Sequence, residues 1–173
     1  MGLDISVYQK VNFVTSKDEL LEAGVTETEI DSYYDRYVWI YVNPSFAKQA
    51  DGLKTGFYTG NYVNGFRAGS YSGYGYFREK LSRLALDVEP AQVWNNPDNF
   101  VDKPFVDLIN FSDCEGVIGP ETSARLFRDF ERHLERAKTF PKENEYDFFL
   151  NTYLSFMNAF ELASKDNGVV RFH

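Results

Sequence analysis

The sequence is poor in the residues on which several common kinds of site depend. Cys114 is the only cysteine among 173 residues, which excludes an intramolecular disulfide and a zinc site built from several cysteines of one chain. Only two histidines are present, and the patterns HxxxH, HxH and GxSxG do not occur. The Gly-Lys-Ser/Thr sequence of a P-loop is missing as well. Familiar metallohydrolase, serine-hydrolase and nucleotide-triphosphate motifs are therefore absent.

Positive charge and long apolar runs are also scarce. The chain has 18 Lys and Arg against 26 Asp and Glu, which gives a formal charge of −8. A broad surface for duplex nucleic acid needs clustered Lys and Arg, so we expect no duplex partner, although a small pocket with one or two arginines is compatible with this charge. No apolar run approaches the length of a membrane span, and residues 1–10 lack the basic start and apolar core of a signal peptide. We expect a cytoplasmic protein without a membrane partner.

Aromatic residues, in contrast, are abundant. There are 16 Phe, 12 Tyr and 2 Trp, and together they make up 17% of the chain. Some of them must pack the core, but this number of tyrosines leaves a surplus for a ligand-binding surface. The length and the hydrophobic content of 43% predict one globular domain over residues 1–173.

The residue patterns predict an α+β fold, with a small, mainly antiparallel sheet packed by about three longer helices. Alternating apolar residues and aromatic, β-branched runs predict strands at 3–8, 37–42 and 169–173. The last strand is expected to pair with the first, which would bring His173 beside Asp4. The glycine-rich residues 52–75 favour short strands joined by tight turns, with a hairpin at Asn64-Gly65.

Helices are expected where apolar residues recur at helical spacing and start signals precede them. Short helical segments are predicted at 17–23 and within 26–34, and longer helices at 76–86, 120–138 and 144–164. Pro120 followed by an acid marks the start of the second long helix, and Gly168 is expected to end the last one in a left-handed conformation. Residues 89–104 are predicted to form a long surface loop that acts as a lid or a binding loop.

Two small polar segments next to predicted helices are the strongest candidates for a site. Gly69–Gly75 is expected to be a loop of small residues that runs into a helix, an arrangement suited to holding phosphate, although an ordinary tight connection explains it equally. Ser112–Gly116 is a compact polar segment before the helix that begins at Pro120. Its carboxylates, Asp113 and Glu115, either belong to a site or cap the turn and the helix.

We expect polar residues at strand ends and in the glycine-rich loops to converge on one cleft. The candidate ligand-binding residues are Asp4, Arg67, Ser70, Tyr71, Ser72, Tyr74, Trp94, Asp113 and Glu115. If the protein is an enzyme, the candidate catalytic residues are Asp113, Glu115 and His173. Cys114 is a weak candidate nucleophile because no histidine lies near it in the sequence. No cofactor and no bound metal are expected.

Four motifs carry a resemblance to known sequences. They are MGLDI with a following Tyr8, GSYSGY at 69–74, the segment from Phe105 to Pro120, and DNG with a terminal FH at 166–173. The chain resembles a family of uncharacterised phage and prophage proteins that carry these motifs. The resemblance covers most of the chain and implies a phage origin rather than a particular chemistry. Small phage accessory proteins are often similar in role to counter-defence factors, some of which bind or cut nucleotide signals of host immunity.

Three functions are compatible with these observations. The first is a binding protein that sequesters a nucleotide-like ligand, such as a cyclic nucleotide or an ADP-ribose-type signal, by stacking a base and holding phosphate. The second is a hydrolase or phosphodiesterase-like enzyme that uses Asp113 and Glu115, with a magnesium site made of carboxylates as a further option. The third is an acidic inhibitor that binds a basic protein. We rank them in that order, and a homo-oligomer is compatible with each.

Overall fold

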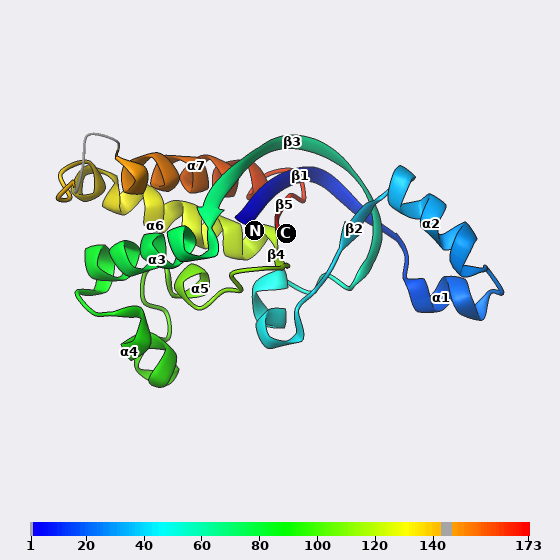
Figure 1. The fold of residues 1–173 in the computed structure, drawn as a ribbon, viewed down its shortest axis with the longest axis horizontal. Coiled ribbons are helices and arrows are strands. Elements are labelled where there is room, and N and C mark those ends of the chain that lie inside the picture. Colours follow the sequence, from blue (N-terminus) through cyan, green and yellow to red (C-terminus); the bar gives the residue numbers. More distant parts are fainter. Residues whose placement is uncertain (1, 143–146) are drawn as a thin grey trace.

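The fold is organised around a curved sheet of five antiparallel strands. The computed structural model describes residues 2–142 and 147–173. The strands lie in the order β2-β3-β1-β5-β4 and are joined throughout by antiparallel ladders. Their bounds are β1 Gly2–Thr15, β2 Val38–Ile40, β3 Gly56–Ser70, β4 Gly116–Ile118 and β5 Val169–Phe172. Figure 1 shows β1 and β3 as a long two-stranded arch that spans the middle of the molecule.

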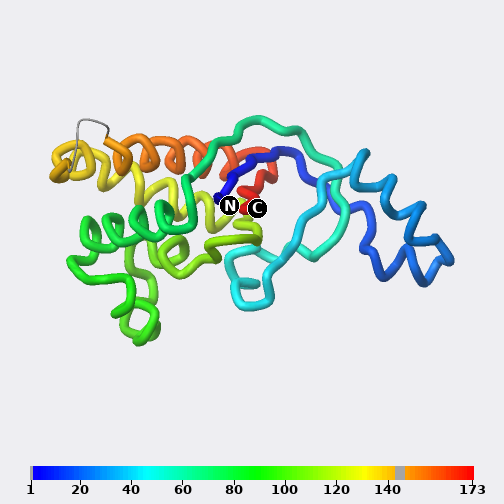
Figure 2. The backbone as a smooth tube through the Cα atoms, viewed as in Figure 1, coloured from blue at the N-terminus to red at the C-terminus, as the bar shows by residue number. Residues whose placement is uncertain are grey.

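Helices lie at both ends of this arch. The long helices α3, α6 and α7 lie together at one end, and the short α1 and α2 project beyond the other (Figures 1 and 2). The helical bounds are α1 Lys17–Glu22, α2 Glu27–Arg36, α3 Tyr71–Leu86, α4 Pro90–Asn95, α5 Val106–Ile109, α6 Pro120–Lys138 and α7 Phe148–Ala163, with 3-10 helices η1 Pro44–Ala50 and η2 Pro97–Phe100. The predicted α+β class is confirmed. The expected start of the last helix at 144 falls outside the described residues.

The hairpin predicted at Asn64-Gly65 is wrong, because β3 runs through both residues without a turn. Asn64 pairs with Val7 and Gly65 with Ser6 in the ladder with β1. Glycine at position 65 instead allows the Tyr62 hydroxyl to lie close to the backbone, since a Cβ there would collide with that hydroxyl. A long partner strand therefore overrides the local turn preference of Asn-Gly, because pairing with β1 holds both residues in extended backbone.

The loop predicted at Gly69–Gly75 is also wrong, because α3 begins at Tyr71 rather than at 76. Ser70 is the N-cap of this helix, and its hydroxyl accepts a hydrogen bond from the backbone N–H of Gly73 at 3.1 Å. Gly69 has φ of +109°, which only glycine adopts readily, and it makes the bend between β3 and α3. The small residues therefore form a strand end and a first helical turn.

Gly168 was expected to be the left-handed residue after the last helix, and this expectation is wrong. The positive φ values belong to Asp166 and Asn167, at 50° and 51°. Gly168 is needed for packing, because a Cβ there would lie 2.7 Å from the Cα of Ala163. The predicted loop at 89–104 is interrupted by α4 and η2, so it is only partly irregular.

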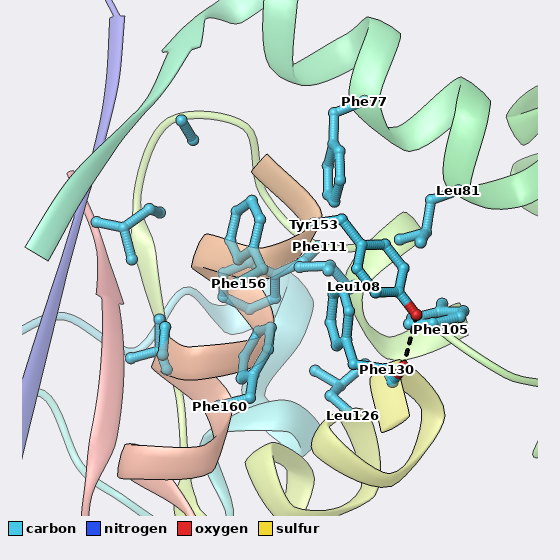
Figure 3. Close-up of a cluster of buried hydrophobic side chains, with 14 of the residues drawn as sticks. Phe77, Leu81, Phe105, Leu108, Phe111, Leu126, Phe130, Tyr153, Phe156 and Phe160 are labelled. Carbon is cyan, nitrogen blue, oxygen red and sulfur yellow. Dashed lines mark hydrogen bonds between the residues drawn. The ribbon is translucent and has the colours of Figure 1, made fainter. Parts of the chain in front are cut away.

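The main core fills the space between the three long helices and one face of the sheet. Figure 3 shows its aromatic centre, where Phe77, Phe130, Phe156 and Phe160 meet around α7. The ring centroids of Phe77 and Phe156 lie 5.2 Å apart in a stacked arrangement. Tyr153 donates its hydroxyl to the carbonyl of Phe130 at 2.6 Å, and burial raises the pKa of this phenol. Many of the abundant aromatic residues are thus used inside the protein.

β5 occupies an interior position in the sheet, between β1 and β4. Ile5 pairs with Phe172, and the backbone groups of Asp4 and His173 exchange hydrogen bonds of 2.9 and 3.0 Å. The predicted pairing of the first and last strands is therefore confirmed, and His173 lies beside Asp4. The opposite face of the sheet carries a smaller apolar cluster formed by Val11, Ile40, Ala50, Tyr58, Val117 and Val169. Over 2–142 and 147–173, no helix combines the length and apolarity required to cross a membrane.

Candidate functional site

Four of the predicted polar residues form one row across the sheet. Asp4 on β1 is the register partner of Arg67 on β3, and its carboxylate lies 3.9 Å from the Arg67 guanidinium. On its other side Asp4 pairs with His173 through the backbone. Gly116 of β4 pairs with Phe172 of β5, so Glu115 follows in register beside His173. Strand pairing therefore brings together residues that are up to 169 positions apart in the sequence.

His173 is the titratable centre of this row. Its Nε2 lies 2.9 Å from the hydroxyl of Ser6, and the pKa of the imidazole is lowered mainly by burial and also by the positive charge of Arg171, while Asp4 opposes the shift. A pocket of about 140 Å³ lies here. Its lining residues are Trp39, Tyr41, Glu115, Gly116, Arg171, Phe172 and His173. Ligand pockets commonly measure about 300–1,000 Å³, so this one is too small for a nucleotide.

We expect His173 to titrate below the value of about 6.5 that is typical of an unperturbed histidine. Because the unfolded chain then binds the proton more readily than the folded protein, this residue should lower stability as the pH falls below about 6.5, until both states are protonated. Arg171→Gln should raise the His173 pKa and Asp4→Asn should lower it further. An NMR titration of the ring proton measures these shifts. A midpoint in the native protein at or above that in urea would contradict the expectation.

The polar segment at 112–116 is stabilised by hydrogen bonds to the Ser112 hydroxyl rather than by the carboxylates of Asp113 and Glu115. The Ser112 hydroxyl accepts backbone hydrogen bonds from Cys114 at 3.3 Å and Glu115 at 3.1 Å. Within the described ranges neither Asp113 nor Glu115 caps the turn or α6. The Asp113 carboxylate lies 3.6 Å from the guanidinium of Arg78, and Cys114 is exposed. Of the two alternatives for Asp113 and Glu115, capping of the turn and of α6 is therefore not what the structure has.

A second group of predicted site residues, Tyr74, Trp94 and Asp113, surrounds Arg78 on α3. Arg78 is 8% exposed and donates to the carbonyl of Phe111 at 3.0 Å. Its guanidinium lies 4.7 Å from the ring centroid of Tyr74 and 5.4 Å from that of Trp94. The Trp94 indole N–H donates to the carbonyl of Ile109 at 3.1 Å. These contacts fasten α4 and the segment after α5 to α3, which is a structural role.

Tyr74, Ser70, Ser72 and Tyr71 do not form the expected loop site. Tyr74 is fully buried in the core, and its hydroxyl lies 3.4 Å from the carbonyl of Leu108. The hydroxyls of Ser70 and Ser72 bond to each other at 2.9 Å, and only Tyr71, which is 38% exposed, presents a ring to solvent. The predicted site residues are thus divided between the charged row, the Arg78 group and the start of α3.

A larger cavity lies elsewhere, and none of the predicted site residues lines it. It has a volume of about 570 Å³, which is within the range of small-molecule sites. We call it the basic cleft. Its lining residues are Lys48, Gln49, Pro97, Val101, Asp102, Lys103, Val106, Asp107, Asn110, Arg125, Arg128, Asp129 and Arg132. They come from η1, from the segment predicted to be a binding loop, from α5 and from α6.

One hydrogen-bond network joins three walls of the basic cleft. Asp51, at the end of η1, accepts hydrogen bonds from both the backbone N–H and the hydroxyl of Thr122 at 2.8 Å. The carboxylate therefore caps the positive N-terminus of α6 from a distant part of the chain. Arg125 donates to the Thr122 hydroxyl at 2.8 Å and to the Asp107 carboxylate on α5 at 3.1 Å. Asp51, Thr122, Arg125 and Asp107 thus hold η1, α5 and α6 in place.

Four other cations of the cleft are free to bind a ligand. Lys48, Lys103, Arg128 and Arg132 are all exposed, and none has an ion-pair partner among the residues that the structure describes. The Asp129 carboxylate accepts a hydrogen bond from the backbone N–H of Phe105 at 3.0 Å. The cleft has five basic and three acidic lining residues, so it is net positive on a protein whose formal charge is −8.

The sequence contained a signal for this cleft. Arg125, Arg128 and Arg132 are spaced by three and four positions, so they lie along one face of a helix. Leu126 and Phe130 define the buried face of the same helix. The strongly negative total charge conceals this signal, because a local excess of positive charge depends on which segments fold against α6.

Comparisons of the chain with protein-family models, with curated proteins and with solved structures found no match. Across 2–142 and 147–173, no three or more His, Cys, Asp or Glu residues are grouped in a way that could hold a metal ion. The geometry of the described residues is thus the basis for a functional assignment.

Proposed function

We propose that the protein binds a small, anionic, nucleotide-like ligand in the basic cleft and sequesters it. The observation that carries this proposal is the set of four unpaired cations, Lys48, Lys103, Arg128 and Arg132, around a cavity of about 570 Å³. The unpaired cations repel one another locally. An anionic ligand relieves this repulsion, and charge-assisted hydrogen bonds to arginine supply affinity.

The arrangement favours binding over hydrolysis. Asp113 lies beside Arg78, whereas Glu115 and His173 line a pocket of about 140 Å³, so the residues expected for an enzyme do not meet around a nucleotide-sized space. In the basic cleft, Asp107 is paired with Arg125. Together with the resemblance to phage proteins, this supports a counter-defence role in which a nucleotide signal of host immunity is withdrawn in the cytoplasm of an infected bacterium.

Thermal stabilisation by nucleotides tests the proposal. The protein is incubated with cyclic mononucleotides, cyclic dinucleotides and ADP-ribose derivatives, and its melting temperature is followed, since a ligand that binds the native state at 100 times its Kd stabilises by about 2.7 kcal/mol. The protein is then denatured and the released ligand analysed. An intact ligand supports sequestration, a chemically altered one indicates the hydrolase, and no stabilisation by any nucleotide refutes the proposed function.

The projecting arm formed by α1 and α2 favours a second candidate function. Residues 17–36 contain seven Asp and Glu and two Lys and Arg, so most of the net negative charge of the chain lies there. Figure 1 shows these helices well away from α3, α6 and α7. This arm is suited to an acidic inhibitor that covers a basic protein. If nucleotides fail to bind, capture of a basic host protein that is lost when Glu27, Glu29 and Asp31 become Gln or Asn supports this alternative.

A further inference from the structure

The arrangement of charge in the basic cleft narrows the class of ligand, an inference that rests on the proposed function. Arg125 and Asp107 neutralise each other through their 3.1 Å contact. The remaining cations are Lys48, Lys103, Arg128 and Arg132, and the remaining carboxylates are Asp102 and Asp129. The cleft therefore has two positive charges in excess. A ligand with two negative charges neutralises this positive excess.

The cations are not gathered at one point. Arg128 and Arg132 are four positions apart on α6, which separates them by about 6 Å along the helix axis. Lys48 belongs to η1, and Lys103 lies between η2 and α5. The positive charge is thus distributed over separate walls of a cavity of about 570 Å³. A single phosphate monoester concentrates about −1.5 to −2 charge on one group, so it matches cations on separate walls less well than two separated charges do.

We propose that the ligand carries two separated, singly charged phosphodiester groups, as a cyclic dinucleotide does. Each group contacts one of the two free arginines, and the lysines of the facing walls flank them. Two phosphodiesters supply the two negative charges that the cleft requires. A diphosphate such as that of ADP-ribose carries its charges on adjacent groups that share one bridging oxygen, so it matches this distribution less well.

Ligands with the same base and different arrangements of charge test the inference. Cyclic di-AMP has two separated phosphodiesters, AMP one monoester, ADP-ribose one diphosphate, and 3′,5′-cyclic AMP one phosphodiester. Calorimetry on the full chain should find cyclic di-AMP at least about tenfold tighter than each of the others, because it alone engages both arginines. The guanine counterparts, measured in parallel, separate the effect of the base from that of the charge.

The Arg132→Gln variant provides the second measurement. It should weaken cyclic di-AMP about tenfold, to the level of cyclic AMP, and weaken cyclic AMP itself much less, because that ligand needs only one arginine. Equal or tighter binding of AMP or ADP-ribose would overturn the inference and leave the proposed function standing. An absence of binding by every nucleotide would overturn both.

Discussion

Removal of Val169–His173 should abolish cooperative folding. Val169, Val170 and Phe172 are at most 1% exposed, and burial of each such side chain contributes about 1.5–3 kcal/mol. β5 also pairs with β1 on one side and β4 on the other, so its loss leaves two strands without their partner. Since a whole domain is stable by only about 5–15 kcal/mol, the deletion removes most of this margin.

Circular dichroism during thermal and urea unfolding measures this effect, and a shorter truncation provides the control. Deletion of His173 alone removes one backbone pair with Asp4 and leaves the buried side chains of β5 in place. This variant should retain a cooperative transition with a modestly lower melting temperature. If the five-residue truncation melts within a degree or two of the full chain, the interior position of β5 is incorrect.

Reversal of the two free arginines, Arg128→Glu with Arg132→Glu, should eliminate nucleotide binding without unfolding the protein. Each charge-assisted hydrogen bond contributes about 1.5–3 kcal/mol, so the loss of two lowers affinity by at least about 100-fold, and the new carboxylates repel the phosphates as well. Both side chains are exposed, and substitutions at such positions usually change stability by less than about 0.5 kcal/mol.

A control outside the cleft is Arg36→Glu on α2, which makes half of the charge change of the cleft variant. Arg36 is exposed, lies in the last turn of its helix and has no ion-pair partner in the described part of the chain. It tests whether binding responds to the total charge of the protein or to the cleft. Titration calorimetry should show unchanged affinity for this control. Equal loss of binding in the control and the cleft variant would mean that the ligand does not bind between η1, α5 and α6.

Much of the fold could be predicted because it depends on local signals. The Ser16–Glu19 capping box, the Pro120 helix start and the apolar spacing of α6 all act within a few residues, and each element lies where the sequence predicts it. At Asn64-Gly65 a distant partner overrides the local preference. Asn64-Gly65 favours a turn by itself, but a ladder with β1 holds it extended. The expectation for Gly69–Gly75 is wrong for a local reason, because Ser70 is an N-cap and α3 begins at Tyr71.

The candidate site is predicted only in part because segments far apart in the sequence form it. Pairing of the terminal strands was expected, so the meeting of Asp4 and His173 followed from the sequence, and Arg67 and Glu115 joined them through β3 and β4. The basic cleft was not foreseen, because its walls come from four separate segments. The sequence by itself determined the charge, the helical spacing of Arg125, Arg128 and Arg132, and most helices and strands. The tertiary structure decided that these arginines line one cavity together with Lys48 and Lys103, because only the folded chain, held by Asp51 and Thr122, brings η1 against α6.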